Sequence, residues 1–386
     1  MKTKRIVTLL SALLALVMLF GATACNNKPA ETTAAPAAVT DAPEAEETEA
    51  PEAEETEAPE AEETEAAEAS GDSEAEYVIT GASANPETHP YGQGLLKFAE
   101  LLDEKSGGRI QMNSFHAGQL GSERDLVESM QLNQVQVAVI TSAPLAGFTD
   151  AYLIFDLPFL FASVDEARYL CDSEIGQEML GSLEDKGVKA LAFMENGMRN
   201  ITNSKLPIEN PDDMKGIKIR TMENPMHMEA FSALGADPTP MAFGELFTGL
   251  QQKAIDAQEN PLVVIHANNF FEVQEYLSMT GHLYSPAPLM MSKEFYDSLP
   301  EDLQAVVDEA AIEAAAYQRG VCDEQEAEML KLLEESGMKV NFTDAAPFRE
   351  ATMQVYDKYV GDGEGKVSPA IYDEAQTVLQ EYRDNQ

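Results

Sequence analysis

The stretch GIKIRTMENPMHMEAFSALG, residues 216–235, contains a strand followed directly by a helix. Its first residues alternate isoleucine with a basic side chain, and this two-residue period is typical of a strand with one buried face. Asn224 and Pro225 indicate a helix start, and Gly235 follows the expected helix end. The pattern places Arg220 where a strand ends and a helix is about to begin, the edge at which open α/β sheets bind ligands.

The rest of the chain repeats this alternation, which predicts an α/β fold with sheets covered by helices. Two C-terminal helices are expected near residues 346–360 and 368–384. A helical stretch from Pro300 to Ser336 is too long for one small domain, so we expect it to contact two. Further predicted strands are EYVITGA (76–82), RIQMNSF (109–115), VQVAVITSA (135–143) and VKALAFMENG (188–197), and further helices are residues 91–108 and 122–132, the second with a start signal at Ser122.

The chain is strongly acidic, with 68 Asp and Glu against 25 Lys and Arg and a formal net charge of −43. Proteins that bind nucleic acid neutralise phosphates with Lys and Arg, which this surface mostly lacks. We therefore expect no nucleic-acid partner. At 386 residues the chain is long enough for two ordinary domains or one large one.

The N-terminus has the pattern of an export signal. A positive segment with Lys2, Lys4 and Arg5 precedes an apolar run over residues 6–20, and GATAC then ends in Cys25. A membrane-spanning helix needs roughly 20 apolar residues, so this run is short for one. The small residues ending in Cys resemble the lipobox of bacterial lipoproteins, which implies that Cys25 is acylated and becomes the first mature residue. Ordinary cleavage and an uncleaved anchor are the alternatives.

An acidic low-complexity segment separates this signal from the rest. The octapeptide PEAEETEA occurs three times, beginning at Pro43, Pro51 and Pro59, and residues 31–76 hold 18 acids and no base. Such a segment cannot bury a core and its charges repel one another, so it predicts a tether. Binding of cations or of a partner protein by this segment is a less favoured alternative.

The remaining residue types give little sign of catalysis. Cys171 and Cys322 could pair in an oxidising compartment or stay as buried thiols, and no spacing of Cys or His predicts a metal site. The sequence has no nucleophile elbow and no glycine-rich phosphate loop. We therefore expect no enzyme activity, no metal and no cofactor.

Two arginines stand out in this arginine-poor chain. Arg220 ends one predicted strand, and Arg199 in NGMRNIT follows the strand expected to run from Val188 to Met194. Guanidinium groups at strand ends suit a ligand carboxylate, which they bind through two parallel hydrogen bonds. The alternative is that either arginine pairs with a structural Asp or Glu, and the residue pattern alone does not choose between them.

Four ordered motifs resemble a known family. HAGQLGSERDLVESMQ (116–131), NGMRNITNSKLPIENPDDMKGIKIRT (196–221), GADPTPMAFGELFTGLQ (235–251) and IDAQENP (255–261) are similar to motifs of DctP-type substrate-binding proteins of tripartite ATP-independent periplasmic (TRAP) transporters. The resemblance covers residue 78 to the C-terminus. It implies a two-lobed periplasmic-binding-protein-like fold, with a ligand cleft between the lobes and a long helix touching both.

The resemblance also implies site residues. The arginine that forms the main salt bridge with a substrate carboxylate falls on Arg220, and further pocket residues fall on Arg199, Asn260 and Phe243. The segment after the third strand contributes contacts in the family, and here it reads Thr141 and Ser142.

Each of these assignments has a structural alternative. Phe243 could belong to the core, Asn260 could cap the helix that follows Pro261, and the two hydroxyl residues could simply end their strand. Ala257 stands where the family usually has Gly, which puts the local backbone geometry in doubt.

The sequence thus predicts an extracytoplasmic receptor, anchored to the outer face of the cytoplasmic membrane, that gives a small organic acid to the small and large membrane subunits of a TRAP transporter. A receptor for an ABC transporter or a sensor kinase is the main alternative, and a tethered surface module is another. We expect a monomer. The expected parts are a signal peptide (1–24), the lipidated tether (25–76) and the binding domain (77–386), with lobe I at 77–197 plus 286–326 and lobe II at 198–285 plus 327–386.

Overall fold

The computed structural model describes residues 75–386. The predicted signal peptide, Cys25 and nearly all of the acidic tether lie outside the described residues. Among the residues that are described, no helix is both long and apolar enough to cross a membrane.

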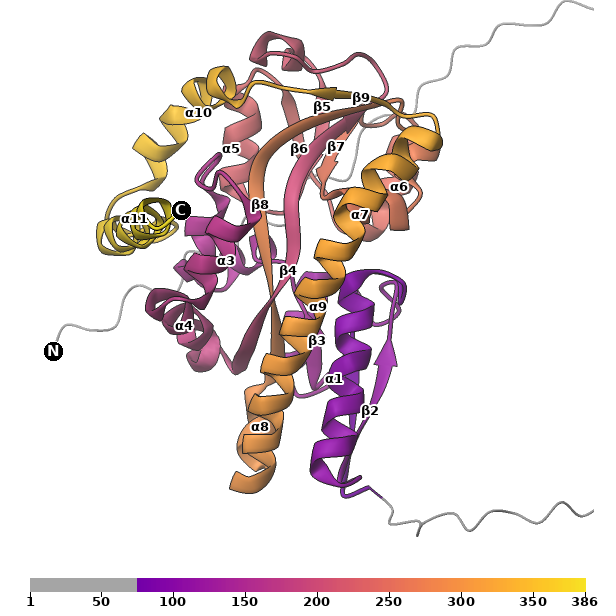
Figure 1. Ribbon diagram of the computed structural model, residues 1–386, viewed down its shortest axis with the longest axis vertical. Helices are drawn as coiled ribbons and strands as arrows, with labels where there is room; N and C mark the ends of the chain where they lie inside the picture. The colour runs from indigo at the N-terminus through magenta and orange to yellow at the C-terminus, as the bar shows by residue number, and fades with distance from the viewer. Residues whose placement is uncertain (1–74) are drawn as a thin grey trace, which may run out of the picture. The chain divides into compact units, whose positions relative to one another are not determined.

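A mixed sheet of nine strands organises the described chain (Figure 1). The strand order is β2-β1-β3-β8-β4-β7-β5-β6, and β9 pairs with β8. Parallel pairing joins β1 to β2 and β3 in one half of the sheet, and β5 to β6 and β7 in the other. The strands are β1 (Tyr77–Ala82), β2 (Ile110–Phe115), β3 (Val137–Val139), β4 (Val188–Asn203), β5 (Lys218–Thr221), β6 (Asp237–Pro240), β7 (Ala257–Asn260), β8 (Tyr276–Ser292) and β9 (Lys339–Phe342).

The long strands β4 and β8 join the two halves. They pair antiparallel with each other, while β3 pairs with the end of β8 and β7 pairs with the end of β4. Their register shifts at three places, one of them between Glu195 and Gly197. Irregularities of this kind bend a strand and re-aim its side chains. The two halves are therefore the cores of two lobes that share continuous strands.

Helices cover the sheet, and the longest of them serves both lobes. Helix α9 is one continuous helix of 35 residues that packs against α1 and β4 and, further along, against α7 (Figure 1). The predicted long helix that contacts both lobes is thus confirmed. The helices are α1 (Pro90–Ser106), α2 (Glu123–Gln131), α3 (Val164–Asp172), α4 (Glu174–Leu180), α5 (Pro225–Ala233), α6 (Leu246–Gln251), α7 (Leu262–Ala267), α8 (Lys293–Ser298), α9 (Glu301–Glu335), α10 (Ala345–Tyr359) and α11 (Pro369–Asp384).

Local sequence signals explain where the helices begin and end. Ser122 accepts a hydrogen bond from the Asp125 backbone N–H, and Asp125 accepts one in return, which forms a capping box at α2. Asn224 accepts from two backbone N–H groups at the start of α5. Gly107 ends α1 in a left-handed conformation, with φ 65°, that suits glycine.

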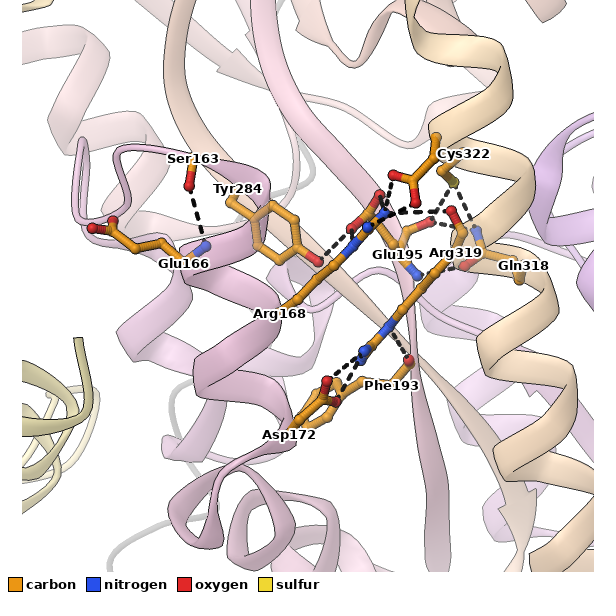
Figure 2. Close-up of polar contacts among 11 residues, drawn as sticks. Ser163, Glu166, Arg168, Asp172, Phe193, Glu195, Tyr284, Gln318, Arg319 and Cys322 are labelled. Atoms are coloured by element: carbon orange, nitrogen blue, oxygen red, sulfur yellow. Dashed lines mark hydrogen bonds and ion pairs between the residues drawn. The ribbon is translucent and has the colours of Figure 1, made fainter. Parts of the chain in front are cut away.

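A polar network fastens α9 to β4 and α3 (Figure 2). Arg168 of α3 donates to both carboxylate oxygens of Glu195 in β4 at 2.8 Å, and Tyr284 donates to the same carboxylate at 2.9 Å. The side-chain amide of Gln318 in α9 accepts from the Glu195 backbone N–H at 2.9 Å and donates to the Glu195 carbonyl at 2.6 Å. Arg319 of α9 forms an ion pair with Asp172 of α3. This network holds β4 in place directly before Asn196.

The structure corrects the predicted end of one strand and decides between the two alternatives for the cysteines. The predicted strand beginning at Val188 continues to Asn203, so Arg199 lies within β4 and not after a strand end. The reason is that NGMRNIT keeps pairing with β8 and β7 across the register shifts. Cys171 and Cys322 are buried thiols that do not pair with each other.

The last helix, α11, packs against α3 and α4. It therefore contacts elements that were expected in lobe I, although its own residues were expected in lobe II. The lobe boundaries stay predictions.

Candidate functional site

A pocket lies where strand ends from the two lobes face each other. Asn85 follows β1 and Thr141 follows β3, whereas Arg220 lies in β5 and Asn260 ends β7, and all four line the pocket. Phe243, in the short 3-10 helix η5 (Phe243–Glu245), lines it too. Because the strands within each half are parallel, their carboxyl ends meet at one edge, where open sheets bind ligands.

Arg220 is buried without a counter-ion. Its side chain is 2% exposed, and its Nε donates to the Met241 carbonyl at 2.9 Å. Within the described residues it forms no ion pair, and its Nη1 has no hydrogen-bond partner. The guanidinium carbon lies 6.0 Å from the centre of the Phe243 ring. Burial lowers the pKa of Arg220 to about 10, so the side chain stays charged at neutral pH.

Arg199 is buried in a different setting. It is fully enclosed, and its Nε and Nη2 bind the carboxylate of Glu259 at 2.5 Å and 2.8 Å. His282 lies 3.1 Å from the same carboxylate. These partners hold the pKa of Glu259 well below its usual range, although burial alone would raise it. Arg199 therefore has the structural counter-ion that Arg220 lacks, and it does not line the pocket. Its Nη1, like that of Arg220, has no hydrogen-bond partner within the described residues.

Arg199 reaches the pocket through Asn260. Its Nη2 donates to Asn260 Oδ1 at 3.0 Å, and Asn260 Nδ2 donates to Gln258 Oε1 at 2.6 Å. These two contacts fix the orientation of the amide group. Helix α7 begins after Pro261 without a side-chain cap, so Asn260 does not cap it. A free N–H of Asn260 can thus face a ligand.

Glu123 is a pocket residue that the sequence analysis missed. It is the first residue of α2, and its Oε1 accepts from the backbone N–H and the hydroxyl of Thr141 at 2.8 Å and 2.7 Å. Removal from water raises the pKa of this carboxyl group. The one available signal was its place directly after the cap Ser122, at a helix N-terminus.

Other polar groups at the pocket have no protein partner. Asn85 and Asn196 line it, and the Oδ1 atom of each is buried and unpaired within the described chain. Ser142, next to Thr141, does not itself line the pocket, and its buried Oγ is also unpaired within the described residues. Asn196 occupies the register shift of β4 and precedes Gly197, whose φ of 115° requires glycine. Buried polar atoms need partners, so these atoms indicate a polar ligand.

Among the described residues, no group of three or more His, Cys, Asp or Glu side chains could hold a metal ion. The pocket instead offers one unpaired cation and several hydrogen-bonding groups between two lobes. This arrangement defines a solute-binding protein that encloses a small polar anion.

The comparisons with known proteins agree with this class. The family model "Bacterial extracellular solute-binding protein, family 7" (DctP) matches residues 81–362, and the chain belongs to this family. The resemblance to DctP-type substrate-binding proteins is confirmed, and the chain is a solute-binding protein, not an enzyme.

Three similar proteins illustrate the family. The 2,3-diketo-L-gulonate-binding periplasmic protein YiaO of Escherichia coli (strain K12) is 37% identical over 268 residues, which are 69% of this chain and 82% of YiaO. A TRAP periplasmic solute-binding protein from Polaromonas sp. JS666, bound to D-erythronate, has a TM-score of 0.74 at 37% identity and covers 79% of this chain and 98% of its own. Another from Sulfitobacter sp. NAS-14.1, with bound β-D-galacturonate, has a TM-score of 0.73 at 33% identity and covers 80% of this chain and 99% of its own.

Proposed function

We propose that this protein captures a sugar acid, a monocarboxylate with several hydroxyl groups, and delivers it to a TRAP transporter. The observation that carries the proposal is Arg220, a buried guanidinium without a counter-ion at the pocket. A buried charge is costly unless it is paired. A ligand carboxylate supplies the pair, with two hydrogen bonds from the guanidinium.

The chemistry of the other end of the ligand is inferred from the hydrogen-bond acceptors of the pocket. Glu123 and the unpaired amide oxygens of Asn85 and Asn196 accept hydrogen bonds, and hydroxyl groups can donate them. Arg124 also lines the pocket, but it is already paired with Glu128. A second carboxylate beside Glu123 would therefore be repelled, and unfavourable contacts of this kind are a source of specificity. The pocket therefore favours a hydroxylated monocarboxylate over a dicarboxylate. The D-erythronate and β-D-galacturonate bound by the two similar structures support this class.

We keep the roles that the motifs suggest for Arg220, Asn260 and Phe243, and we change that of Arg199. We assign the carboxylate to Arg220, with Asn260 beside it and Phe243 as an apolar wall. Thr141 positions Glu123, and Ser142 contributes a hydroxyl group close by. Arg199 acts through Asn260, whose amide orientation it fixes.

The placement of the protein outside the cytoplasm is also part of the proposal. Residues 1–24 are removed on export, Cys25 carries the lipid, and residues 25–76 separate a monomeric binding domain from the membrane surface. The lipobox-like GATAC and the acidic repeats support this arrangement.

Titration calorimetry tests the ligand class. D-Galacturonate, D-galactonate and D-erythronate are compared with succinate, and we expect at least one sugar acid to bind at least tenfold more tightly than succinate. Arg220→Ala should weaken the best ligand about 30- to 4,000-fold, because truncating a buried charge pair costs about 2–5 kcal/mol. Lys218→Ala, on the same strand but exposed, is the matched control and should bind as wild type does.

Glu123→Gln separates the sugar-acid class from organic acids in general. It removes the charge that repels a second carboxylate, so the preference for the sugar acid over succinate should fall about tenfold. Wild-type protein that prefers succinate, or an Arg220→Ala variant that binds within threefold of wild type, would show that the ligand has been assigned wrongly.

A further inference from the structure

A second hollow adjoins the pocket. It has a volume of about 440 Å³ and shares Ala84 and Phe243 with the pocket around Arg220. Pro86 and Ala117 line it from the ends of β1 and β2, and the segment from Phe243 to Glu272 lines it from the opposite lobe. A ligand held at Arg220 could thus extend past Phe243 into this hollow.

Aromatic side chains form one wall of the hollow. The Phe243 and Phe270 rings lie 6.1 Å apart at 72°, and the Phe247 and Phe270 rings lie 6.4 Å apart at 25°. Phe270 is 2% exposed and anchors the group in the core, whereas Phe243 and Phe247 are only half-buried. Aromatic faces carry negative charge density. They therefore suit the weakly positive C–H face of a sugar ring.

Polar side chains form the rest of the wall. Asn268, Asn269 and Glu272 line the hollow, and they offer amide and carboxylate groups for hydroxyl groups. Asn269 follows α7 in a left-handed conformation, with φ 56°, that asparagine tolerates. The lining contains Glu272 but no Lys or Arg. A second carboxylate would find a like charge here and no cation.

From these observations we infer that the hollow is a subsite for a neutral hexose, and that the protein binds a glycosylated sugar acid, with its acid unit at Arg220 and its hexose against Phe247. Aldobionates, in which a hexose is linked to gluconate, have this composition. The inference rests on the proposed function, because the acid unit must first occupy the inner pocket. It extends that function from a monosaccharide acid to a disaccharide acid.

The test compares D-gluconate with maltobionate, cellobionate and lactobionate by titration calorimetry. These three acids share the gluconate unit and differ in the hexose and its linkage. We expect at least one to bind at least tenfold more tightly than gluconate. Phe247→Leu, which keeps apolar volume but removes the ring, should abolish most of this gain and leave gluconate affinity within twofold.

Two controls keep the result specific. Phe342→Leu changes an exposed phenylalanine of β9, 73% exposed, and should alter neither affinity. Glu272→Ala should weaken the aldobionate severalfold without changing gluconate binding. Thermal unfolding of each variant near the wild-type temperature shows that the fold is intact.

The possible failures point to different assignments. If D-gluconate or D-galacturonate binds but every aldobionate binds equally or more weakly, the subsite is refuted while the sugar-acid receptor stands. If Phe247→Leu weakens gluconate as much as the aldobionate, the hollow is not a separate subsite. If no sugar acid of either size binds, the proposed function fails and the subsite with it.

Discussion

Replacing Arg220 by Met should make the ligand-free protein more stable while it weakens ligand binding. The buried guanidinium has no counter-ion within the described residues, and burial lowers its pKa to about 10. Relative to the ordinary value for arginine, this drop corresponds to about 3 kcal/mol of unfavourable free energy for the charged form. This destabilisation is present at every pH below about 10, where the buried side chain is charged, and it is relieved only above that pH, where the side chain loses its proton.

Methionine fills most of the space of the arginine stem but carries no charge. The variant also loses the hydrogen bond to the Met241 carbonyl, which is worth about 1 kcal/mol. The free energy of unfolding should therefore rise by about 1–2 kcal/mol. Ligand affinity should fall by at least about 2 kcal/mol, since the carboxylate loses its partner.

Urea unfolding at pH 7 without ligand measures the first effect, and calorimetry with the best sugar acid measures the second. Lys218→Met, an exposed change two residues earlier on β5, should leave both quantities close to wild type. A variant that is destabilised by more than about 1 kcal/mol and binds within threefold of wild type would mean that Arg220 is a satisfied structural residue. The reasoning from its missing counter-ion would then be wrong.

Three further changes test other parts of the molecule. The raised pKa of Glu123 means that the folded state disfavours its charged form. Glu123→Gln should therefore unfold at a higher urea concentration than wild type at pH 7, and the difference should be smaller at pH 4. Glu259→Gln leaves Arg199 buried without its counter-ion, so urea unfolding should show a loss of about 3–5 kcal/mol in stability. The double variant with Arg199→Met should recover part of this loss. Cys25→Ser should release the protein from membranes or leave it unprocessed, and wild-type protein found only in the soluble fraction would contradict the lipid anchor.

Much of the fold could be predicted because its signals are local. The caps at Ser122 and Asn224 depend on neighbouring residues only, and each marks the boundary expected from the sequence. The length of β4 could not be predicted in the same way. Its continuation through Gly197 to Asn203 depends on pairing with β8 and β7, which are distant in sequence.

The site was harder to predict than the fold. Periodicity and the family motifs indicated both Arg220 and Arg199, but only the structure shows which one has a counter-ion, since Glu259 is 60 residues from Arg199. Asn85 and Asn196 could not be predicted because nothing in their neighbours marks them as pocket residues, and Glu123 had only its place after the cap Ser122. They come together only in the folded chain, where the segment after β1, the start of α2 and the middle of β4 line one pocket.

The paths of β4, β8 and α9 have a consequence for dissection of the protein. Each of the three passes from one lobe to the other, so each lobe is assembled from separate segments of the chain. No single truncation can yield an isolated lobe, and a protease cut in one connecting strand would leave both fragments with incomplete sheets. Recombination between relatives faces the same restriction, because exchange of one lobe requires a junction in every crossing element. The two lobes must therefore fold, and be engineered, as a single unit.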